Sequence, residues 1–484
     1  MIAAVAYGAY ALAGCGPSGT TKGSTGGAGT TLAGPSTGSS SGVTSTTSTG
    51  TSTAASAGTS PGDLTTTTAA DTEPLSTAPQ TLAVETVPSG ADVSIKLQDG
   101  TSVSGRTPFS QEIPGGRLTV SVSKPGYNPA SQNVALEGGQ SLKMWLDPQA
   151  QIYQSLVRFK CGMQPKQVLF TPDGKELWVS ILGGGVSGLE AYDPLTGKKL
   201  ASVNLGGREA TELIMTKDGK TVFASQMSTS TIWEVDRVTR KVIRHFPSGG
   251  DFTKILLLSR DEKTLYAANW LSNNVSEIDV ASAKVKRLIK TVATPRGLYV
   301  APGDKYLYVA GFGVGEIQKI DLATGKGTVL IKTGGSMRHM AADERKGLLY
   351  VGEFDKGAVY VVDLATDEIT KLADTDQRPN TIDLSPDGKV LYVSNRGKDN
   401  PKSYLIKGPE WGSVLAIDTE TGKTLDAIVG GNQCTGLDVS PDGTLLAFSD
   451  FLDYVIRVYR IPDYSTLLAG NGGRAITHLK DIVK

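Results

Sequence analysis

The feature that most constrains the fold of this chain is a unit that recurs seven times between residues 166 and 461. Its clearest copy, residues 380–395, reads Asn-Thr-Ile-Asp-Leu-Ser-Pro-Asp-Gly-Lys-Val-Leu-Tyr-Val-Ser-Asn. The first residues of the seven copies, which we call the anchors, are Lys166, Thr211, Lys254, Arg296, Arg338, Asn380 and Thr435. Their spacings are 45, 43, 42, 42, 42 and 55 residues. A period of about 40–45 residues is typical of propeller blades with four short strands each.

Each unit alternates apolar and polar residues in short runs, which indicates strands rather than helices. Pro-Asp-Gly between the first two runs predicts a tight turn, because Pro presets φ and Gly accepts a positive φ. Four antiparallel strands make a blade with two bare faces, which must be covered by neighbouring blades. We therefore predict an all-β fold that contains a seven-bladed β-propeller.

The second strand of the unit carries a family resemblance. It reads Leu-Tyr-Val-Ser-Asn at residues 391–395 and Leu-Tyr-Ala-Ala-Asn at residues 265–269. These runs resemble the YVTN-type β-propeller repeats of bacterial and archaeal envelope proteins, over roughly residues 155–470. The resemblance implies the fold but not the activity, because such propellers host binding modules, lactonases, lyases and redox enzymes.

Residues 81–148 form a separate pattern of alternating strands. Pro88-Ser89-Gly90-Ala91, a Gly-x-Thr-Pro element at residues 105–108 and a Lys-x-Gly-Tyr element at residues 124–127 resemble a PEGA domain, with Ser in place of the Glu of the naming motif. The resemblance implies a β-sandwich-like accessory domain at the cell surface. A plain spacer is the alternative.

The first residues indicate export. Leu12-Ala13-Gly14-Cys15 ends a short apolar run and resembles a bacterial lipobox, which implies a signal peptide over residues 1–15 and lipidation of Cys15. The alternative is a poor signal peptide that contains Cys by chance, since the usual basic residues before the apolar run are missing. Gly16 instead of Asp favours the outer membrane. Residues 16–80 are rich in Ser, Thr and Gly and predict a disordered linker.

Two segments compete to complete the last blade. Residues 155–160 lie eleven residues before the first anchor and read as a fourth strand without a blade of its own. Pairing with the seventh unit would close the ring and remove an open edge. Residues 466–469 could supply the same strand, and we favour the N-terminal segment. The propeller is thus expected over residues 152–470, followed by a C-terminal tail over residues 471–484.

The start of each first strand is expected at one mouth of the central channel. Four anchors are basic, and further candidates follow in the loops and after the second strands. The predicted ligand-binding residues are Lys166, Lys254, Arg296, Arg338, Arg378, Trp270, Phe312, Phe354, Asn395, Arg396 and Trp411. Converging cations attract anions. Neutralisation by acidic residues on the same rim, and packing of the Phe rings between blades, are the alternatives. The sixth unit carries an insertion, residues 396–411, that could cover a ligand or be a neutral surface loop.

Catalytic and metal-binding patterns are weak. The chain has 48 basic and 48 acidic residues, three His and three Cys, with no haem motif and no paired-His metal motif. We expect no cofactor, no metal, no catalytic residue and no nucleic-acid partner. His339 with Glu353 is the one base-and-orienter pair considered, although a lone rim His is usually a surface residue.

Cys161 and Cys434 fall near the seam of the ring. A bridge would tie its two ends, but the first and fourth strands of a blade are about 14 Å apart, whereas a disulfide needs Cα atoms within about 7 Å. The sequence leaves a bridge and two separate buried thiols both open.

Together these patterns predict a monomeric, lipid-anchored envelope protein at the outer membrane or cell surface that binds without catalysis. Its expected partner is an envelope protein, a surface glycan or an anionic ligand. A periplasmic enzyme of lactonase-like or lyase-like type, working at the channel mouth, is the alternative.

Overall fold

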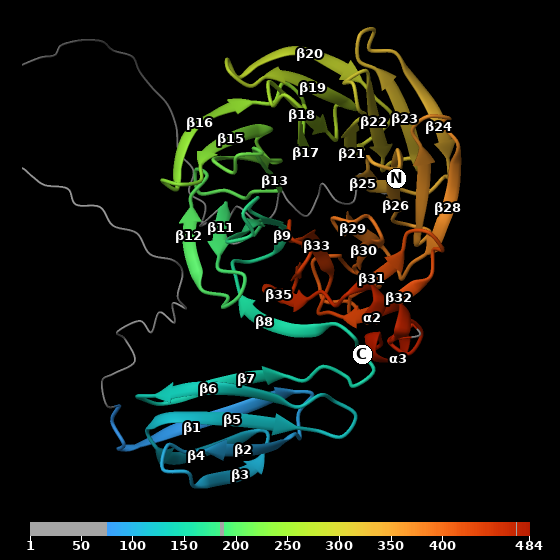
Figure 1. Cartoon of the computed structure of the whole chain (residues 1–484). Helices are drawn as coiled ribbons and strands as arrows, with labels where there is room; N and C mark the ends of the chain where they lie inside the picture. The colour runs from blue at the N-terminus through green and yellow to red at the C-terminus, as the bar shows by residue number, and fades with distance from the viewer. Residues whose placement is uncertain (1–74, 184–187, 471) are drawn as a thin grey trace, which may run out of the picture. The chain divides into compact units, whose positions relative to one another are not determined.

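The computed structural model describes residues 75–183, 188–470 and 472–484 (Figure 1). The expected signal peptide, Cys15 and nearly all of the expected linker lie outside these residues. In the described part of the chain, no helix is long and apolar enough to cross a membrane.

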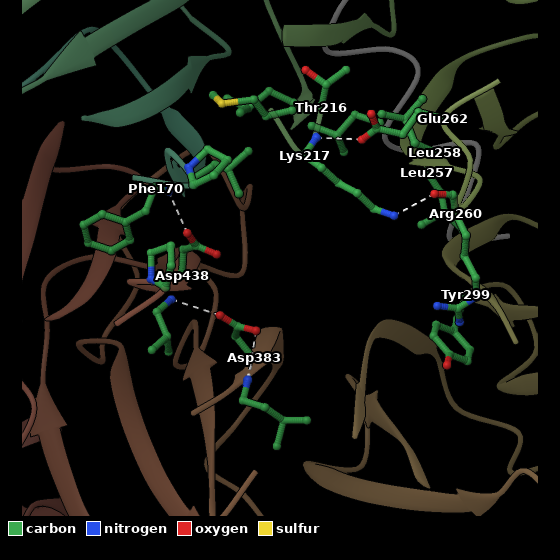
Figure 2. A pocket seen from close by; sticks show the side chains of 18 of the residues that line it. Phe170, Thr216, Lys217, Leu257, Leu258, Arg260, Glu262, Tyr299, Asp383 and Asp438 are labelled. Carbon is green, nitrogen blue, oxygen red and sulfur yellow. Dashed lines mark hydrogen bonds between the residues drawn. The ribbon is translucent and has the colours of Figure 1, made fainter. Parts of the chain in front are cut away.

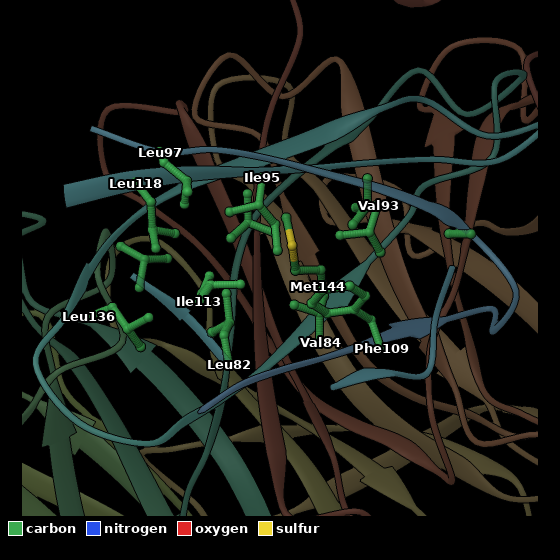
Figure 3. Packing of buried hydrophobic residues seen from close by; sticks show 14 of the residues in the cluster. Leu82, Val84, Val93, Ile95, Leu97, Phe109, Ile113, Leu118, Leu136 and Met144 are labelled. Atoms are coloured by element: carbon green, nitrogen blue, oxygen red, sulfur yellow. The ribbon is translucent and has the colours of Figure 1, made fainter. Parts of the chain in front are cut away.

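The first folded region is a two-layered β-sandwich. Its strands are β1 (Pro79–Val87), β2 (Asp92–Lys96), β3 (Ser102–Arg106), β4 (Phe109–Pro114), β5 (Gly116–Ser123), β6 (Ala130–Leu136) and β7 (Gln140–Trp145). One sheet has the order β4-β1-β7 and the other β3-β2-β5-β6. Figure 3 shows the apolar side chains between them, including Leu82, Ile95 and Leu118, which are almost fully buried. The strands predicted from the alternating pattern, and the β-sandwich that the PEGA resemblance implies, are confirmed.

The three motif elements of this sandwich contact one another. The backbone of Gly90, which has φ of +78°, donates to the carbonyl of Thr107, and the Ala91 N–H donates to the Thr107 hydroxyl at 3.0 Å. Lys124 Nζ donates to the carbonyl of Ser89 at 2.8 Å. The motifs are therefore one hydrogen-bonded turn assembled from three distant segments.

Seven four-stranded antiparallel sheets follow around a common axis (Figure 1). The first two contain β9 (Pro165–Phe170), β10 (Leu177–Ile181), β11 (Leu189–Tyr192) and β12 (Lys199–Val203), then β13 (Glu212–Met215), β14 (Thr221–Gln226), β15 (Thr231–Asp236) and β16 (Lys241–Pro247). The next two contain β17 (Thr253–Leu258), β18 (Thr264–Asn269), β19 (Asn274–Asp279) and β20 (Lys284–Lys290), then β21 (Pro295–Val300), β22 (Tyr306–Gly311), β23 (Glu316–Asp321) and β24 (Gly327–Lys332).

The last three sheets complete the ring. They contain β25 (Met337–Asp343), β26 (Leu348–Glu353), β27 (Ala358–Asp363) and β28 (Ile369–Asp374), then β29 (Pro379–Leu384), β30 (Val390–Asn395), β31 (Ser413–Asp418) and β32 (Thr424–Val429), and finally β33 (Cys434–Val439), β34 (Leu445–Asp450), β35 (Val455–Arg460) and β8 (Gln154–Lys160). The first strand of each sheet contacts that of the next, and β33 contacts β9. The predicted seven-bladed propeller is therefore confirmed.

The N-terminal segment closes the ring, as expected. Strand β8 pairs antiparallel with β35, with Val157 opposite Val458. The competing C-terminal segment is not a strand, because residues 464–469 form helix α2 (Tyr464–Ala469). A second short helix, α3 (Leu479–Ile482), lies in the tail. The insertion of the sixth unit connects β30 to β31, in the loop where the spacing placed it.

Asp426 on β32 ties both ends of the propeller region to the sixth sheet. The side chain is fully buried, and one carboxylate oxygen accepts the N–H groups of Ile152 and Tyr153 while the other accepts that of Arg474. Buried N–H groups without an acceptor are costly, so this carboxylate stabilises the chain before β8 and after α2 together.

We expect Asp426→Ala to lower the free energy of unfolding by roughly 3 kcal/mol, because three N–H groups lose their acceptor at once. Chemical denaturation of the full-length protein measures the change. The control is Asp374→Ala, whose carboxylate is 80% exposed and, within the described part of the chain, pairs with Lys371 three residues away. Equal stability of the two variants would contradict the role given to Asp426.

Candidate functional site

The anchors lie at the start of the first strands, where the ladder is irregular. Six of them occupy the second position of β9, β17, β21, β25, β29 and β33, and Thr211 directly precedes β13. In those six strands the register shifts across the anchor, as between Pro295 and Gly297 around Arg296. An irregularity of this kind re-aims the side chain of the residue that it frees from pairing.

A serine hydroxyl of the second strand holds several of these irregular turns. Ser180 Oγ accepts the N–H of Gln167, next to the first anchor, and donates to the carbonyl of Thr211, the second anchor, at 3.0 Å. Ser394 does the same between Thr381 and Thr435. The serine near the end of the second strand therefore fixes the anchor backbone of its own sheet and that of the next sheet.

The backbone before the anchors is strained. Residues two positions before five anchors have positive φ although none is Gly: Gln164, Phe252, Thr294, Arg378 and Gln433, with φ between +51° and +65°. Such a conformation costs about 1–3 kcal/mol and persists only where the surroundings determine it. Its repetition at one end of the propeller indicates that the backbone there is held in a defined arrangement.

At the centre of this end, Arg296 pairs with Glu212 of the second sheet. Arg296 Nη2 and Glu212 Oε1 are 2.6 Å apart, and the two side chains are 5% and 8% exposed. Burial alone would raise the pKa of Glu212, but Arg296 and Lys166 outweigh it, so that the pKa is lowered. Arg296 Nη1 is buried without a hydrogen-bond partner among the described residues.

More cations surround this pair than one carboxylate can balance. Burial, and then the charges of Arg338 and Arg296, lower the pKa of Lys166 well below its usual value. Burial, Arg296 and Arg338 do the same to Lys254. Among the described residues, the contacts of the two ammonium groups are with ring faces, and neither has a hydrogen-bond acceptor. An approaching negative charge would stabilise the protonated form of both amines.

Aromatic rings alternate with these cations. Phe252, Trp270, Phe312 and Phe354 form a continuous row with centroid separations of 5.8, 5.8 and 5.4 Å. Lys254 Nζ lies 3.2 Å from the Trp270 centroid, and Arg338 lies 5.1 Å from that of Phe354. Contacts of a cation with a ring face are favourable and hold the cation in place without neutralising it. We call these rings and cations, with Arg296, Arg378 and Arg396, the mouth cluster.

The insertion reaches this cluster through two residues. The Asp399 carboxylate accepts a hydrogen bond from Arg378, and one of its oxygens lies 3.5 Å from Arg396 Nη2. The Tyr404 ring centroid lies 5.5 Å from the Arg396 guanidinium, which is also 5.8 Å from that of Phe354. Arg378 and Arg396 therefore belong to the mouth, as the sequence predicted, but with a partner from the insertion.

Two predicted ligand-binding residues lie elsewhere. Asn395 is fully buried, and its amide donates to the Val393 carbonyl. Trp411, at the end of the insertion, contacts the C-terminal tail. Its backbone N–H donates to the Ile482 carbonyl, and Lys484 Nζ lies 4.3 Å from its ring centroid. The structure therefore places these two residues apart from the mouth cluster, because Asn395 is buried in its sheet and Trp411 lies against the tail.

The base-and-orienter pair considered from the sequence is not assembled. His339 Nδ1 lies 3.1 Å from the Ile382 carbonyl, and burial lowers the pKa of His339 to about 4. Both oxygens of Glu353 accept backbone N–H groups, from Ser336 and Lys356. Among the described residues no group of His, Cys, Asp and Glu side chains could hold a metal ion.

Cys161 and Cys434 are free cysteines, so the bridge left open by the sequence is absent. Cys434 begins the inner strand β33, and its thiol lies 3.4 Å from Asp450 Oδ1. Cys161 follows β8, the outer strand of the same sheet. The width of the sheet separates them, which is the physical reason why two separate thiols are found.

A cavity of about 690 Å³ lies at the other end of the first strands (Figure 2). It is lined by strand ends such as Phe170, Leu258 and Tyr299, and by Asp383 and Asp438. Burial raises the pKa of Asp383 to about 6 and that of Asp438 well above its usual value. The lining of this end is apolar with charges of both signs, including Lys217 and Arg260, whereas the mouth cluster is cationic and aromatic.

Sequence reasoning found the cations of the mouth but missed two of their partners. Phe252, which begins the ring row, precedes a β-strand and carries no repeat signal. Asp399 lies in the insertion, three residues after Arg396, and only that spacing could have indicated the pair. Neutralisation by acidic rim residues was left open as an alternative, and the structure shows it at one position, Glu212. It does neutralise Arg296, whereas Asp450 pairs with Arg457 instead.

Comparison with known proteins agrees with this architecture. Residues 248–435 match the family model of YNCE-like beta-propellers, and residues 80–150 match that of the PEGA domain. The chain is thus a β-propeller protein. More particularly, it joins an N-terminal PEGA domain to a YNCE-like propeller.

Two individual proteins are similar to parts of the chain. Antigen Lp49 of Leptospira interrogans serogroup Icterohaemorrhagiae serovar copenhageni (strain Fiocruz L1-130) is 58% identical over 84 residues, which are 17% of this chain and 18% of that protein. The chain therefore spans less than a fifth of the length of this relative. Among solved structures, Kuenenia stuttgartiensis hydrazine synthase superposes with a TM-score of 0.53 at 19% identity, covering 63% of this chain and 97% of that chain. This second likeness concerns the fold alone.

We expect Glu212→Gln to lower the free energy of unfolding by about 3 kcal/mol, because it leaves Arg296 and its neighbouring cations without a buried counter-charge. Added sulfate should restore part of the loss by supplying negative charge. Thermal denaturation with and without sulfate measures both effects. The control Glu368→Gln removes an exposed carboxylate on an outer strand turn, and an equal loss there would contradict the prediction.

Proposed function

We propose that the protein is a non-catalytic binding protein of the cell surface whose propeller mouth takes an anionic ligand. The observation that carries the proposal is the convergence of Lys166, Lys254, Arg296 and Arg338 around a single buried carboxylate, Glu212. Buried donors normally find partners. Here a ligand oxyanion would supply the acceptor that Arg296 Nη1 and the two lysines lack.

The ring row supports the choice of a ligand that joins an anionic group to an apolar or flat part. Trp270 and Phe312 remain partly exposed beside the cations. Exposed rings next to charged donors form a surface on which a flat group can pack while its charge meets the cations. Two hydrogen bonds to Asn380, at 3.1 and 2.9 Å, fix the guanidinium group of Arg338. Its remaining N–H groups therefore have a defined direction.

The absence of catalysis is also our proposal. The carboxylic acid and the imidazole of the mouth are both engaged: Arg296 holds Glu212 ionised, and His339 lies against a backbone carbonyl. A general base needs a pKa near the working pH and access to the proton that it removes. The pKa of His339 is near 4, below the neutral range in which such a base would work.

We further propose that the chain is exported and anchored in the outer membrane or at the cell surface through Cys15. The PEGA domain and the relative named as an antigen support a surface location. The run Leu12-Ala13-Gly14-Cys15 supports the anchor. The Ser/Thr/Gly-rich residues 16–80 have a composition suited to a tether that holds the propeller away from the lipid.

The anion proposal predicts binding of sulfate, which keeps its charge across the neutral range. We expect Lys166→Gln/Lys254→Gln to weaken sulfate binding about tenfold or more, since a hydrogen bond to a charged group contributes about 1.5–3 kcal/mol. Affinity should also be lower at the higher of two pH values that span the lowered pKa values of the two lysines. The free lysines have lowered pKa values, so binding takes up protons and is favoured at low pH.

Isothermal titration calorimetry at both pH values, in low salt, makes this measurement. The matched control is Arg460→Ala, which removes an exposed cation at the end of β35. Sulfate affinity that is the same in the double variant, the control and the wild type would exclude the mouth as the site.

The anchor proposal predicts labelling by a palmitate analogue in bacteria that express the natural gene. Cys15→Ala should abolish the label, because the thiol of this residue is the acceptor. Cys161→Ala serves as the control and should keep the label. Label that persists in Cys15→Ala would show that the chain is not lipidated at this position.

A further inference from the structure

Arg378, Arg396 and Gln433 form a compact set of donors around one carboxylate from the insertion. Asp399 accepts a hydrogen bond from Arg378 and a second from Gln433 Nε2 at 3.2 Å, and Arg396 lies 3.5 Å away. The Asp399 side chain is 14% exposed. Two guanidinium groups and an amide around one carboxylate are the arrangement with which proteins recognise carboxylate and phosphate ligands.

This donor set is continuous with the rest of the mouth cluster. The guanidinium carbons of Arg338, Arg378 and Arg396 lie 5.1, 5.6 and 5.8 Å from the centroid of the same ring, Phe354. Arg396 Nε is buried and has no hydrogen-bond partner in the described part of the chain. One oxyanion beside Phe354 can therefore contact N–H donors of Arg338 as well as those of Arg378 and Arg396. Asp399 engages only some of these donors.

The two halves of the insertion are attached differently. Its second half is fixed by the C-terminal tail, through hydrogen bonds from Trp411 N–H to Ile482 and from Lys484 N–H to Pro409, at 2.7 and 3.0 Å. For residues 398–405, the hydrogen bonds to the propeller that the structure describes run through the Asp399 carboxylate and the Tyr404 carbonyl. Within the insertion, the Lys398 N–H donates to Glu410 Oε2 and Asn400 Nδ2 donates to the Lys407 carbonyl, at 2.9 and 3.1 Å. The first half is thus held to the propeller itself at two points, one of which is a negative charge.

We propose that the Asp399 carboxylate occupies the place of an anionic group of the ligand. When the ligand binds, its carboxylate or phosphate group replaces Asp399 as the partner of Arg378 and Arg396. This exchange releases the first half of the insertion. This inference rests on the proposed anion site and adds to it a subsite with a built-in competitor. The exchange replaces one charged hydrogen-bond acceptor by another, so the donors stay satisfied throughout. A ligand without a negative charge gains nothing from the exchange and leaves the insertion in place.

The experiment compares wild type with Asp399→Asn in full-length protein, using sulfate as the probe. Removing the competitor should raise sulfate affinity about tenfold, within the range typical of coupled sites. The matched control is Asp251→Asn, which removes an exposed carboxylate three residues before Lys254. Calorimetry reports affinity, and trypsin cleavage after Lys398 or Lys402 reports release of the first half of the insertion.

Support requires that Asp399→Asn binds sulfate more tightly than Asp251→Asn, and that sulfate speeds cleavage of the insertion in wild type. Equal gains in the two variants would mean a general effect of net charge and would overturn the inference. Slower or unchanged cleavage with saturating sulfate would overturn it as well, while leaving the anion site intact. If neither wild type nor Asp399→Asn binds sulfate, the proposed function itself fails, and this inference fails with it.

Discussion

The structure depends on how each first strand of the propeller is fixed to the next. At the mouth, a serine hydroxyl accepts an N–H group freed by the irregular ladder and donates to the neighbouring anchor, as Ser180 and Ser394 do. The fifth sheet has Gly352 at this position, and there Arg338 Nε donates to the carbonyl of Asn380 at 3.1 Å. Arg338 thus has a structural role that keeps it in the mouth, although no described carboxylate pairs with it.

Gathering several cations is unfavourable without a counter-charge, and the protein limits this cost by local means. Glu212 balances Arg296, ring faces support Lys254 and Arg338, and Asp399 balances Arg378 and Arg396. None of these devices supplies acceptors for the lysines or for Arg296 Nη1. Functional sites commonly keep such destabilising features because the ligand removes them. The proposed anion site is inferred from these donors without an acceptor rather than from the number of basic residues.

The sequence allowed the fold to be predicted because the repeat makes every strand visible seven times. The spacing of the anchors placed Lys166, Arg296 and Arg338 at one end, and the unpaired run at residues 155–160 indicated the closing strand. The insertion has no counterpart in the other units, so its contacts could not be derived. The contact of Trp411 with the tail and that of Asp399 with the arginines depend on the path of one loop, which periodicity does not determine.

The opposite end of the channel shows that a charged group in a cavity is not by itself a ligand site. Asp383 accepts the Val439 N–H of the next first strand at 2.9 Å, and Asp438 accepts the Phe170 N–H across the seam at 2.6 Å. These carboxylates join neighbouring sheets as the serines do at the mouth, so a structural role accounts for both (Figure 2). The mouth differs because its donors exceed its acceptors. That excess, and not the shape of the channel, distinguishes the end that is suited to bind an anion from the end that holds the ring together.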